Sequence, residues 1–159
     1  MRLLEQRFMN QGIEVRMAQK EDLDQILVLC KEHATYEDSE YDETGTSIQL
    51  ASCLIRNQPT LVCWVATCDR RIVGYTTFMK QFSTWGAGFY VYMDCLFVKD
   101  GFRNQGIGRQ LFKQVKNFAR SAKCPEIQWQ TPIENIRAIK FYEREGATVK
   151  QKARCFYCL

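Results

Sequence analysis

The sequence predicts an α/β protein in which a single mixed sheet carries helices on both of its faces. Its 159 residues are enough to bury one compact core without disulfides or metals. Segments with the alternating pattern of strands and segments with the spacing of helices follow one another along the chain. No repeat, low-complexity tract or linker rich in Pro, Gly and Ser divides them. We therefore expect one domain over residues 1–159, with 1–12 as an N-terminal extension.

The first half of the chain is expected to begin with a strand over residues 13–17. A helix over 22–33 follows, because apolar residues recur there at helical spacing. Its stripe consists of Leu23, Ile26, Leu27 and Cys30. The other elements expected before residue 83 are a helix near 47–56 and strands over 61–68 and 72–82, joined by a tight turn at 69–71.

The second half contains the longest amphipathic pattern of the chain. A glycine-containing turn over 83–88 leads into a central strand over 89–98. The helix that follows has one buried stripe, formed by Ile107, Leu111, Val115, Phe118 and Ala122. The last expected elements are a short strand over 126–130, a helix over 135–145 that Gly146 stops, and a terminal hairpin from residue 148.

Composition places the protein among soluble globular chains. No segment approaches the roughly 18 uninterrupted apolar residues of a membrane span. The apolar residues at the N-terminus are interrupted by Glu5, Gln6 and Arg7, which argues against the core of a signal peptide. We therefore expect a cytoplasmic protein without a membrane partner.

The eight cysteines are expected to be reduced and mostly buried thiols. Most of them lie inside apolar runs, where a free cysteine behaves as a small hydrophobic residue. Cys155 and Cys158 have the spacing of a zinc motif, but no second pair of ligands accompanies them. We expect no metal.

Charge is distributed unevenly along the chain. Five of the eight residues from Tyr36 to Glu43 are acidic, whereas residues 99–123 contain seven basic residues and one Asp. One part of the surface is therefore expected to attract cations and another to attract anions. The basic residues of the long helix form a stripe, which is read either as a solvated face or as an anion-binding face. No aromatic residues interleave with them, and we expect no nucleic-acid partner.

The turn between the central strand and the long helix has the composition of a phosphate-binding loop. It reads Arg103-Asn104-Gln105-Gly106-Ile107-Gly108. Gly106 and Gly108 would let backbone N–H groups approach a phosphate at the positive end of the helix dipole. No Gly-Lys-Ser/Thr follows, so the turn is not a P-loop. A tight turn without any ligand is the alternative.

Two motifs together resemble the GNAT acetyltransferases. The first is Arg103-x-x-Gly106-x-Gly108 after the strand YMDCLFV, and the second is Glu134-Asn135-x-x-Ala138-x-x-Phe141-Tyr142-x-x-x-Gly146-Ala147. Both occur in the order and separation found in that family. The resemblance implies a mostly antiparallel twisted sheet and acetyl-CoA as the co-substrate.

Within that family the chain is most similar to the diamine acetyltransferases of the spermidine/spermine type. This similarity rests on residues 34–37, Trp85 and Met93-Asp94, in addition to the second motif. The chain departs from the subgroup at Asp94, where glutamate is usual, and at residues 131–134, where Trp-Asn-Glu-Pro is usual. The resemblance implies a small cationic amine as acceptor and a homodimer.

The resemblance assigns the proton transfers to two residues. An alkyl amine with a pKa of about 10 must lose a proton before it attacks a thioester. Asp94 is the candidate base, directly or through water, and Tyr142 is the candidate acid toward the CoA sulfur. A carboxylate satisfied by neighbouring groups and a core aromatic residue are the respective alternatives.

The remaining site residues follow from the same resemblance. The expected acetyl-CoA contacts are Leu96, Phe97, Val98, Arg103, Asn104, Gln105, Gly106, Ile107, Gly108, Arg109, Asn135, Ala138 and Tyr142. The expected acceptor contacts are Tyr36, Glu37, Trp85, Asp94, Gln128 and Gln130. A solvated acidic loop is the alternative for the first of these, and His33 is expected to cap its helix.

Two other functions remain open at this point. The acceptor could instead be an amino acid, an aminoglycoside or a protein amine. A CoA-binding regulatory domain without catalysis is a different class, but it would be expected to lack both Asp94 and Tyr142.

Overall fold

The computed structural model describes residues 12–42, 46–54 and 60–157, and the chain forms two compact units, 1–129 and 130–159. The second unit contains one helix, α5 (Ile136–Arg144). The elements of the first unit, in chain order, are β1 (Ile13–Met17), η1 (Lys20–Asp22), α2 (Leu23–Tyr36), α3 (Thr46–Leu54), β2 (Val62–Cys68), β3 (Arg71–Ser83), β4 (Gly88–Val98), η2 (Asp100–Phe102), α4 (Ile107–Ser121) and β5 (Ile127–Gln128).

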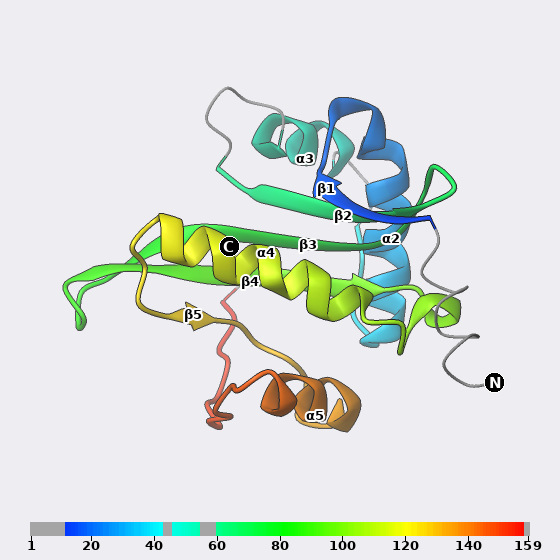
Figure 1. The fold of residues 1–159 in the computed structure, drawn as a ribbon. Coiled ribbons are helices and arrows are strands. Elements are labelled where there is room, and N and C mark those ends of the chain that lie inside the picture. Colours follow the sequence, from blue (N-terminus) through cyan, green and yellow to red (C-terminus); the bar gives the residue numbers. More distant parts are fainter. Residues whose placement is uncertain (1–11, 43–45, 55–59, 158–159) are drawn as a thin grey trace. The chain divides into compact units, whose positions relative to one another are not determined.

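The first unit is built on a five-stranded sheet in the order β1-β2-β3-β4-β5 (Figure 1). The first four strands are antiparallel to their neighbours, whereas β5 is parallel to β4. β3 and β4 pair over ten positions, but β5 pairs with β4 only at Val91 and Tyr92. The mostly antiparallel mixed sheet expected from the sequence is confirmed.

Helices cover both faces of this sheet, as expected. One face packs Val65, Tyr75 and Phe97 against Ile26 and Leu29 of α2. The opposite face packs Ala66 and Val73 against Ile107 and Leu111 of α4. Two bulges shift the register of the sheet: β3 has one extra residue opposite Ala66 and Thr67 of β2, and β4 has one extra residue opposite Thr77 and Phe78 of β3.

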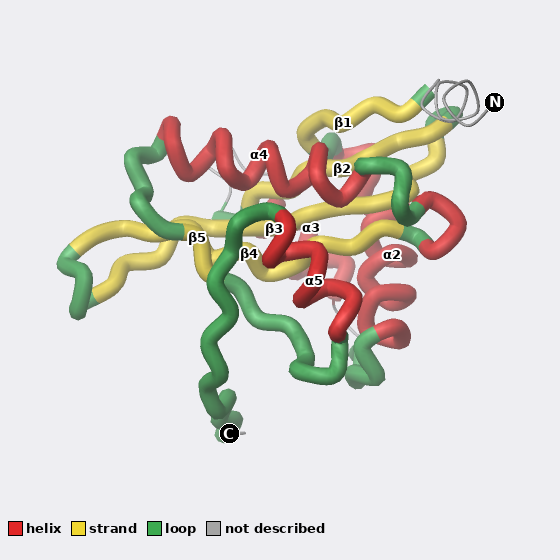
Figure 2. Tube along the Cα trace, turned by 60° about the horizontal axis from the view of Figure 1, so that its bottom comes forward, coloured by secondary structure: helices red, strands yellow, loops and turns green. Residues whose placement is uncertain are grey.

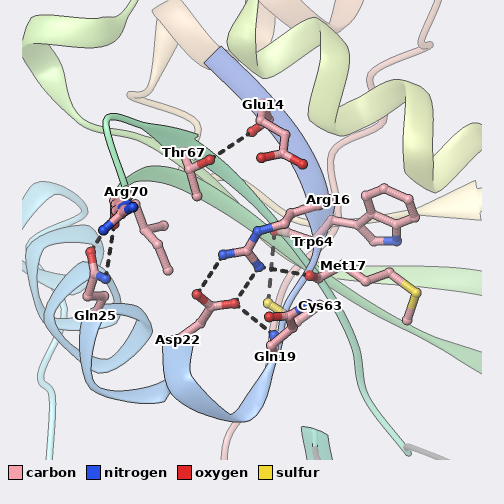
Figure 3. Close-up of polar contacts among 11 residues, drawn as sticks. Glu14, Arg16, Met17, Gln19, Asp22, Gln25, Cys63, Trp64, Thr67 and Arg70 are labelled. Carbon is pink, nitrogen blue, oxygen red and sulfur yellow. Dashed lines mark hydrogen bonds and ion pairs between the residues drawn. The ribbon is translucent and has the colours of Figure 1, made fainter. Parts of the chain in front are cut away.

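A partly buried ion pair joins β1 to the start of α2 (Figure 3). The Arg16 guanidinium donates to both carboxylate oxygens of Asp22, over 2.6 and 2.9 Å. Asp22 also accepts from the backbone N–H of Gln19 at 2.7 Å. The hydrogen bonds from Arg16 outweigh the effect of burial and lower the pKa of Asp22.

The helix α2 runs three residues beyond its expected end, to Tyr36. It stops at Asp38, which adopts a left-handed conformation with a φ of 52°, and the Ser39 N–H bonds back to the Ala34 carbonyl. This is the hydrogen bonding of a glycine-type C-terminal motif, with aspartate in place of glycine. The expected capping role of His33 is wrong, because its ring stacks on Phe97 of the sheet.

The expected terminal hairpin is also wrong for the described residues, because Thr148–Tyr157 form no strand. No Gly, Asn or Asp follows Gly146 to form a tight turn, and Lys150, Lys152 and Arg154 repel one another. Gly146 itself stops α5 as expected, with a φ of 91°. None of the described helices is both long and apolar enough to cross a bilayer.

The described cysteines are all free thiols, but fewer are buried than expected. Only Cys63 and Cys124 are buried, whereas Cys155 is exposed. Cys30 and Cys95 are partly buried around the Tyr75 hydroxyl. Among the residues that the structure describes, no group of three or more His, Cys, Asp or Glu side chains is placed to hold a metal.

We predict that Asp22→Asn destabilises the protein by about 1–3 kcal/mol at neutral pH, the usual contribution of hydrogen bonds to a charged group. Because the native pKa of Asp22 is lowered, its contribution is present above the unfolded pKa of about 3.9 and is lost as pH falls through the native value. Urea unfolding at several pH values measures this, with the exposed Glu21→Gln as the control. Equal stability losses for both variants at pH 7 would contradict the assignment.

Candidate active site

The centre of the candidate site is a bulge in β4. Thr77 of β3 lies opposite Cys95 and Phe78 lies opposite Met93, so Asp94 is an extra residue on β4. The bulge turns this carboxylate outward, and Asp94 is exposed rather than partly buried. Its described contact is with the Cys95 thiol, at 3.7 Å. Beyond Tyr92 no described strand continues the sheet along β4 on the side of β5.

The end of β4 leads into the predicted phosphate-binding turn. Asn104 and Gly106 both have positive φ, 62° and 79°, and Gly106 is the N-cap of α4. The first N–H groups of α4 therefore point out of the helix toward this turn. A Cβ placed on Gly106 would meet no atom within 4 Å, so the space beside this backbone is open. An anionic group fits such a place.

Arg103 connects this turn to the end of α2. Its Nε donates to the Val98 carbonyl at 2.7 Å, and its Nη1 lies 3.2 Å from Asp100 Oδ1. The guanidinium lies 4.3 Å from the centre of the Tyr36 ring and 5.6 Å from that of Phe97. Much of its donor capacity is therefore used inside the protein, and a phosphate contact from this side chain stays a prediction.

The end of α2 brings several ionisable groups beside β4. Tyr36 is 44% exposed, and Glu32 forms an ion pair of 2.8 Å with Lys99. His33 Nε2 lies 3.6 Å from Glu37 Oε1, and its Nδ1 lies 3.1 Å from the Tyr75 hydroxyl. Tyr36, Glu37 and Asp94 thus lie near Arg103, the first residue of the turn before α4. That they contact the acceptor stays a prediction.

Trp85 is not part of this cluster within one chain. It is fully exposed in the turn between β3 and β4. Figures 1 and 2 show this hairpin tip at the opposite end of the sheet from the C-terminal end of α2. Asp94 lies six residues after Gly88, the first residue of β4, which corresponds to about 20 Å of strand. Gln128 is exposed on β5.

The second unit contains the other predicted residues. Asn135 is the N-cap of α5, and its Oδ1 accepts from the Ala138 N–H at 3.1 Å. Tyr142 is buried, with its ring 5.1 Å from that of Phe141. Gln130 is exposed at the start of this unit. The described contacts thus give Asn135 a capping role in α5 and place Tyr142 among buried residues, while their roles toward acetyl-CoA stay predictions.

Sequence analysis missed the polar contacts beneath this site. The sequence predicts that His33 caps its helix, whereas its ring packs between Phe97 and Tyr75. A usable signal was present, because His33 follows Cys30 at helical spacing and so continues the buried stripe. The neighbouring Tyr75 hydroxyl is buried, which raises the pKa of that tyrosine far above its usual value and keeps it protonated.

The described site thus combines a bulged strand with a glycine turn at a helix N-terminus. The model of the acetyltransferase (GNAT) family matches residues 20–147. The chain therefore belongs to the GNAT acetyltransferase family and is an N-acetyltransferase.

Individual proteins agree with this family. The chain is 26% identical to the thialysine N-epsilon-acetyltransferase of Bos taurus, over 92% of this chain and 90% of the relative. It is 23% identical to the spermidine/spermine N(1)-acetyltransferase-like protein 1 of Homo sapiens, over 84% of this chain and 20% of that protein.

Solved structures show the same fold. An aminoglycoside acetyltransferase from an uncultured soil metagenomic sample superposes with a TM-score of 0.77 at 20% identity, covering 95% of this chain and 98% of that one. An aminoglycoside N-acetyltransferase in complex with CoA gives 0.78 at 17% identity, covering 92% and 95%.

We predict that Gly108→Val weakens acetyl-CoA binding by about tenfold or more, because a branched side chain would stand where the pyrophosphate approaches the helix. Titration calorimetry measures this, with Gly86→Val in the remote hairpin as the control. Gly106 is less suited to the test, since its φ of 79° makes any side chain strained there. Unchanged affinity in a folded Gly108→Val protein would exclude the phosphate-binding turn.

Proposed function

We propose that this protein transfers an acetyl group from acetyl-CoA to a primary amine of a small cationic di- or polyamine. The observation that carries this proposal is the pair of carboxylates beside the cofactor turn. Glu37 lies 3.6 Å from His33, and the charge of Asp94 acts on the same ring. Two carboxylates beside one aromatic-lined site suit a cation. The printed names of the thialysine and spermidine/spermine relatives support the same acceptor class.

The residues around the turn fit the pyrophosphate of acetyl-CoA. The open space at Gly106 and the positive φ at Asn104 and Gly106 leave the backbone accessible to such a group. We assign this contact to residues 103–108, with Arg109 in the first turn of α4. The backbone of Leu96, Phe97 and Val98 would pair with the pantetheine, and Asn135 and Ala138 would complete its binding. Acetyl-CoA supplies the activated acetyl thioester.

Proton transfers at the acceptor nitrogen and at the CoA sulfur accompany the reaction. The acceptor arrives as an ammonium ion, and Asp94 would take its proton directly or through water. The exposure of Asp94 suits a relay through water. Tyr142 would return a proton to the sulfur that leaves. The nitrogen loses two protons on its way from ammonium ion to amide, one before it attacks the thioester and one after the C–N bond forms. One proton is added to the sulfur as the C–S bond breaks, and the other is released to solvent.

A second acceptor class, the diamino acids, has a specific observation in its favour. The Arg103 guanidinium lies over Tyr36, beside the proposed acceptor carboxylates. A cation in this position would suit an acceptor that carries its own carboxylate. The names of the thialysine and L-ornithine relatives agree with such an acceptor. For the whole protein we propose a cytoplasmic enzyme with one catalytic domain.

A homodimer is also proposed. Trp85 could act on an acceptor near Tyr36 only if a second copy supplied it, because the two lie at opposite ends of the sheet in one chain. If two copies share the acceptor site, Trp85→Ala should weaken acceptor binding. If the site is confined to a single chain, Trp85→Ala should leave acceptor binding unchanged.

We predict that Tyr142→Phe lowers kcat by about 10²–10⁴, the usual range for general acid–base catalysis, with little change in acetyl-CoA affinity. Asp94→Asn should also lower kcat, and its defect should shrink at high pH because amines then deprotonate without help. Phe141→Leu is a packing control. Full turnover in Tyr142→Phe would require another proton donor.

We predict that putrescine is acetylated with a higher kcat/KM than neutral or anionic amines, and that this preference falls as salt screens the carboxylates over about 10 Å at 0.1 M. Ornithine differs from putrescine only by its carboxylate, so the pair distinguishes the two acceptor classes. Glu37→Lys should raise the KM for putrescine at least about tenfold, or about 1.4 kcal/mol. Glu40→Lys makes the same charge change on an exposed side chain and is the control.

A preference for uncharged acceptors without any salt dependence would overturn the polyamine assignment. Identical KM values for putrescine in Glu37→Lys and Glu40→Lys would show that Glu37 does not contact the acceptor.

A further inference from the structure

His33 is the only histidine of the chain, and it lies where the end of α2 meets β4. Its ring stacks on Phe97, with 4.9 Å between ring centres and 23° between planes. Nδ1 is 3.1 Å from the Tyr75 hydroxyl, and Nε2 is 3.6 Å from Glu37. The side chain is 14% exposed, so these neighbours hold the ring in one orientation.

The groups around this ring have opposing effects on its charge. Burial lowers the pKa of His33 and is the largest influence, whereas the negative charges of Glu37 and Asp94 favour the protonated form. The positive charge of Arg103 again favours the neutral form. Tyr75 on β3 and Cys95 on β4 are themselves buried, and burial raises the pKa of Cys95 to about 12, so both stay uncharged. Burial likewise raises the pKa of the Cys30 thiol on α2.

The two carboxylates that act on His33 are those assigned above to the cationic acceptor. We propose that His33 is a positioning residue of the acceptor site: its neutral ring leaves Glu37 and Asp94 to the amine, and its protonated ring competes with the amine for them. This inference rests on the proposed function. Under this proposal, binding of the amine weakens at acidic pH because His33 becomes protonated, and not because the carboxylates that contact the amine do.

The sign of the effect follows from the direction of the pKa shift. Because burial favours the neutral ring, His33 is uncharged at neutral pH and takes up its proton below its ordinary value of about 6.5. Protonation places a positive charge 3.6 Å from Glu37. Acceptor affinity should therefore fall as the medium becomes acidic, whereas acetyl-CoA affinity should not change over the same range.

The single histidine makes a direct test possible, because its ring proton resonance needs no assignment. The pH midpoint of this resonance is measured by NMR with and without saturating putrescine. By thermodynamic linkage, a tenfold weaker affinity of the protonated protein appears as a midpoint lowered by about one pH unit when the amine is bound. We expect a lowering of this order. An unchanged midpoint in the presence of bound putrescine overturns the proposal.

Variants of the carboxylates on α2 test which of them shifts the pH midpoint of His33. Glu37→Gln should lower the midpoint in the free protein, because it removes a charge that favours protonation. Glu32→Gln, on the same helix but paired with Lys99, should not lower it. Between pH 7.5 and 5.5 the putrescine KM of the native protein should rise several-fold, and that of His33→Gln should stay flat. If His33 had a purely structural role, His33→Gln would instead raise the KM for putrescine equally at every pH.

Failure of this inference differs from failure of the proposed function. If putrescine is acetylated but the His33 midpoint does not respond to it, only the role of His33 is excluded. If no amine is bound or acetylated, the acceptor assignment falls and the inference falls with it. Should His33→Gln not fold, the titration of the native protein still decides.

Discussion

The extra residue in β4 is the constraint on which both faces of the sheet depend. Met93 lies opposite Phe78, which packs on Phe118 of α4, so this part of β4 faces α4. Without a bulge, every second residue after Met93 would face the same helix. The insertion of Asp94 reverses the alternation, so Cys95 and Phe97 face α2 instead. The stacking of His33 on Phe97 and the outward carboxylate of Asp94 both follow from this one insertion.

A second bulge, in β3, determines the face of the sheet on which Tyr75 lies. Ala66 pairs with Gly74 and Thr67 pairs with Ile72, so Val73 is the extra residue on β3. Val73 then joins the α4 face while Ile72 and Tyr75 join the α2 face. Gly74 has no side chain for a related reason, since a Cβ there would lie 2.9 Å from the Phe97 carbonyl. The close approach of β3 to the end of β4 therefore requires glycine at this position.

Regular patterns explain which parts of this fold could be predicted. The amphipathic stripe of α4, the glycine turn before it and the stop of α5 at Gly146 all depend on local chemistry that a sequence displays directly. The two bulges have no comparable signal, because both faces of the sheet are apolar and a change of phase in the alternation therefore leaves the run of apolar residues unchanged. The faces on which Tyr75 and Phe97 lie therefore cannot be predicted from sequence alone, although the helical spacing of His33 from Cys30 does indicate that the His33 ring is buried. The end of α2 was misjudged because Asp38 takes the conformation usually left to glycine.

Arg103 links the end of β4 and the turn that follows it to the end of α2. One guanidinium contacts the end of β4, the η2 turn and the Tyr36 ring of α2. The Lys99–Glu32 ion pair joins the same two regions a short distance away. A displacement of the turn would therefore move the end of α2, where the proposed acceptor groups lie. The side chain that the first motif suggests for the cofactor also supports the acceptor side.

The thiols of this protein differ in a way that bears on chemical modification. Electrophiles and oxidants react with thiolates, and burial raises the pKa of Cys63 and Cys95 far above neutrality. The thiols around Tyr75 should thus resist alkylation, whereas Cys155 is exposed in the tail after α5. Among the described cysteines, a maleimide dye would attach first to this tail and leave the core of the sheet intact. The same difference makes the tail the first place where oxidative stress would join two molecules through a disulfide.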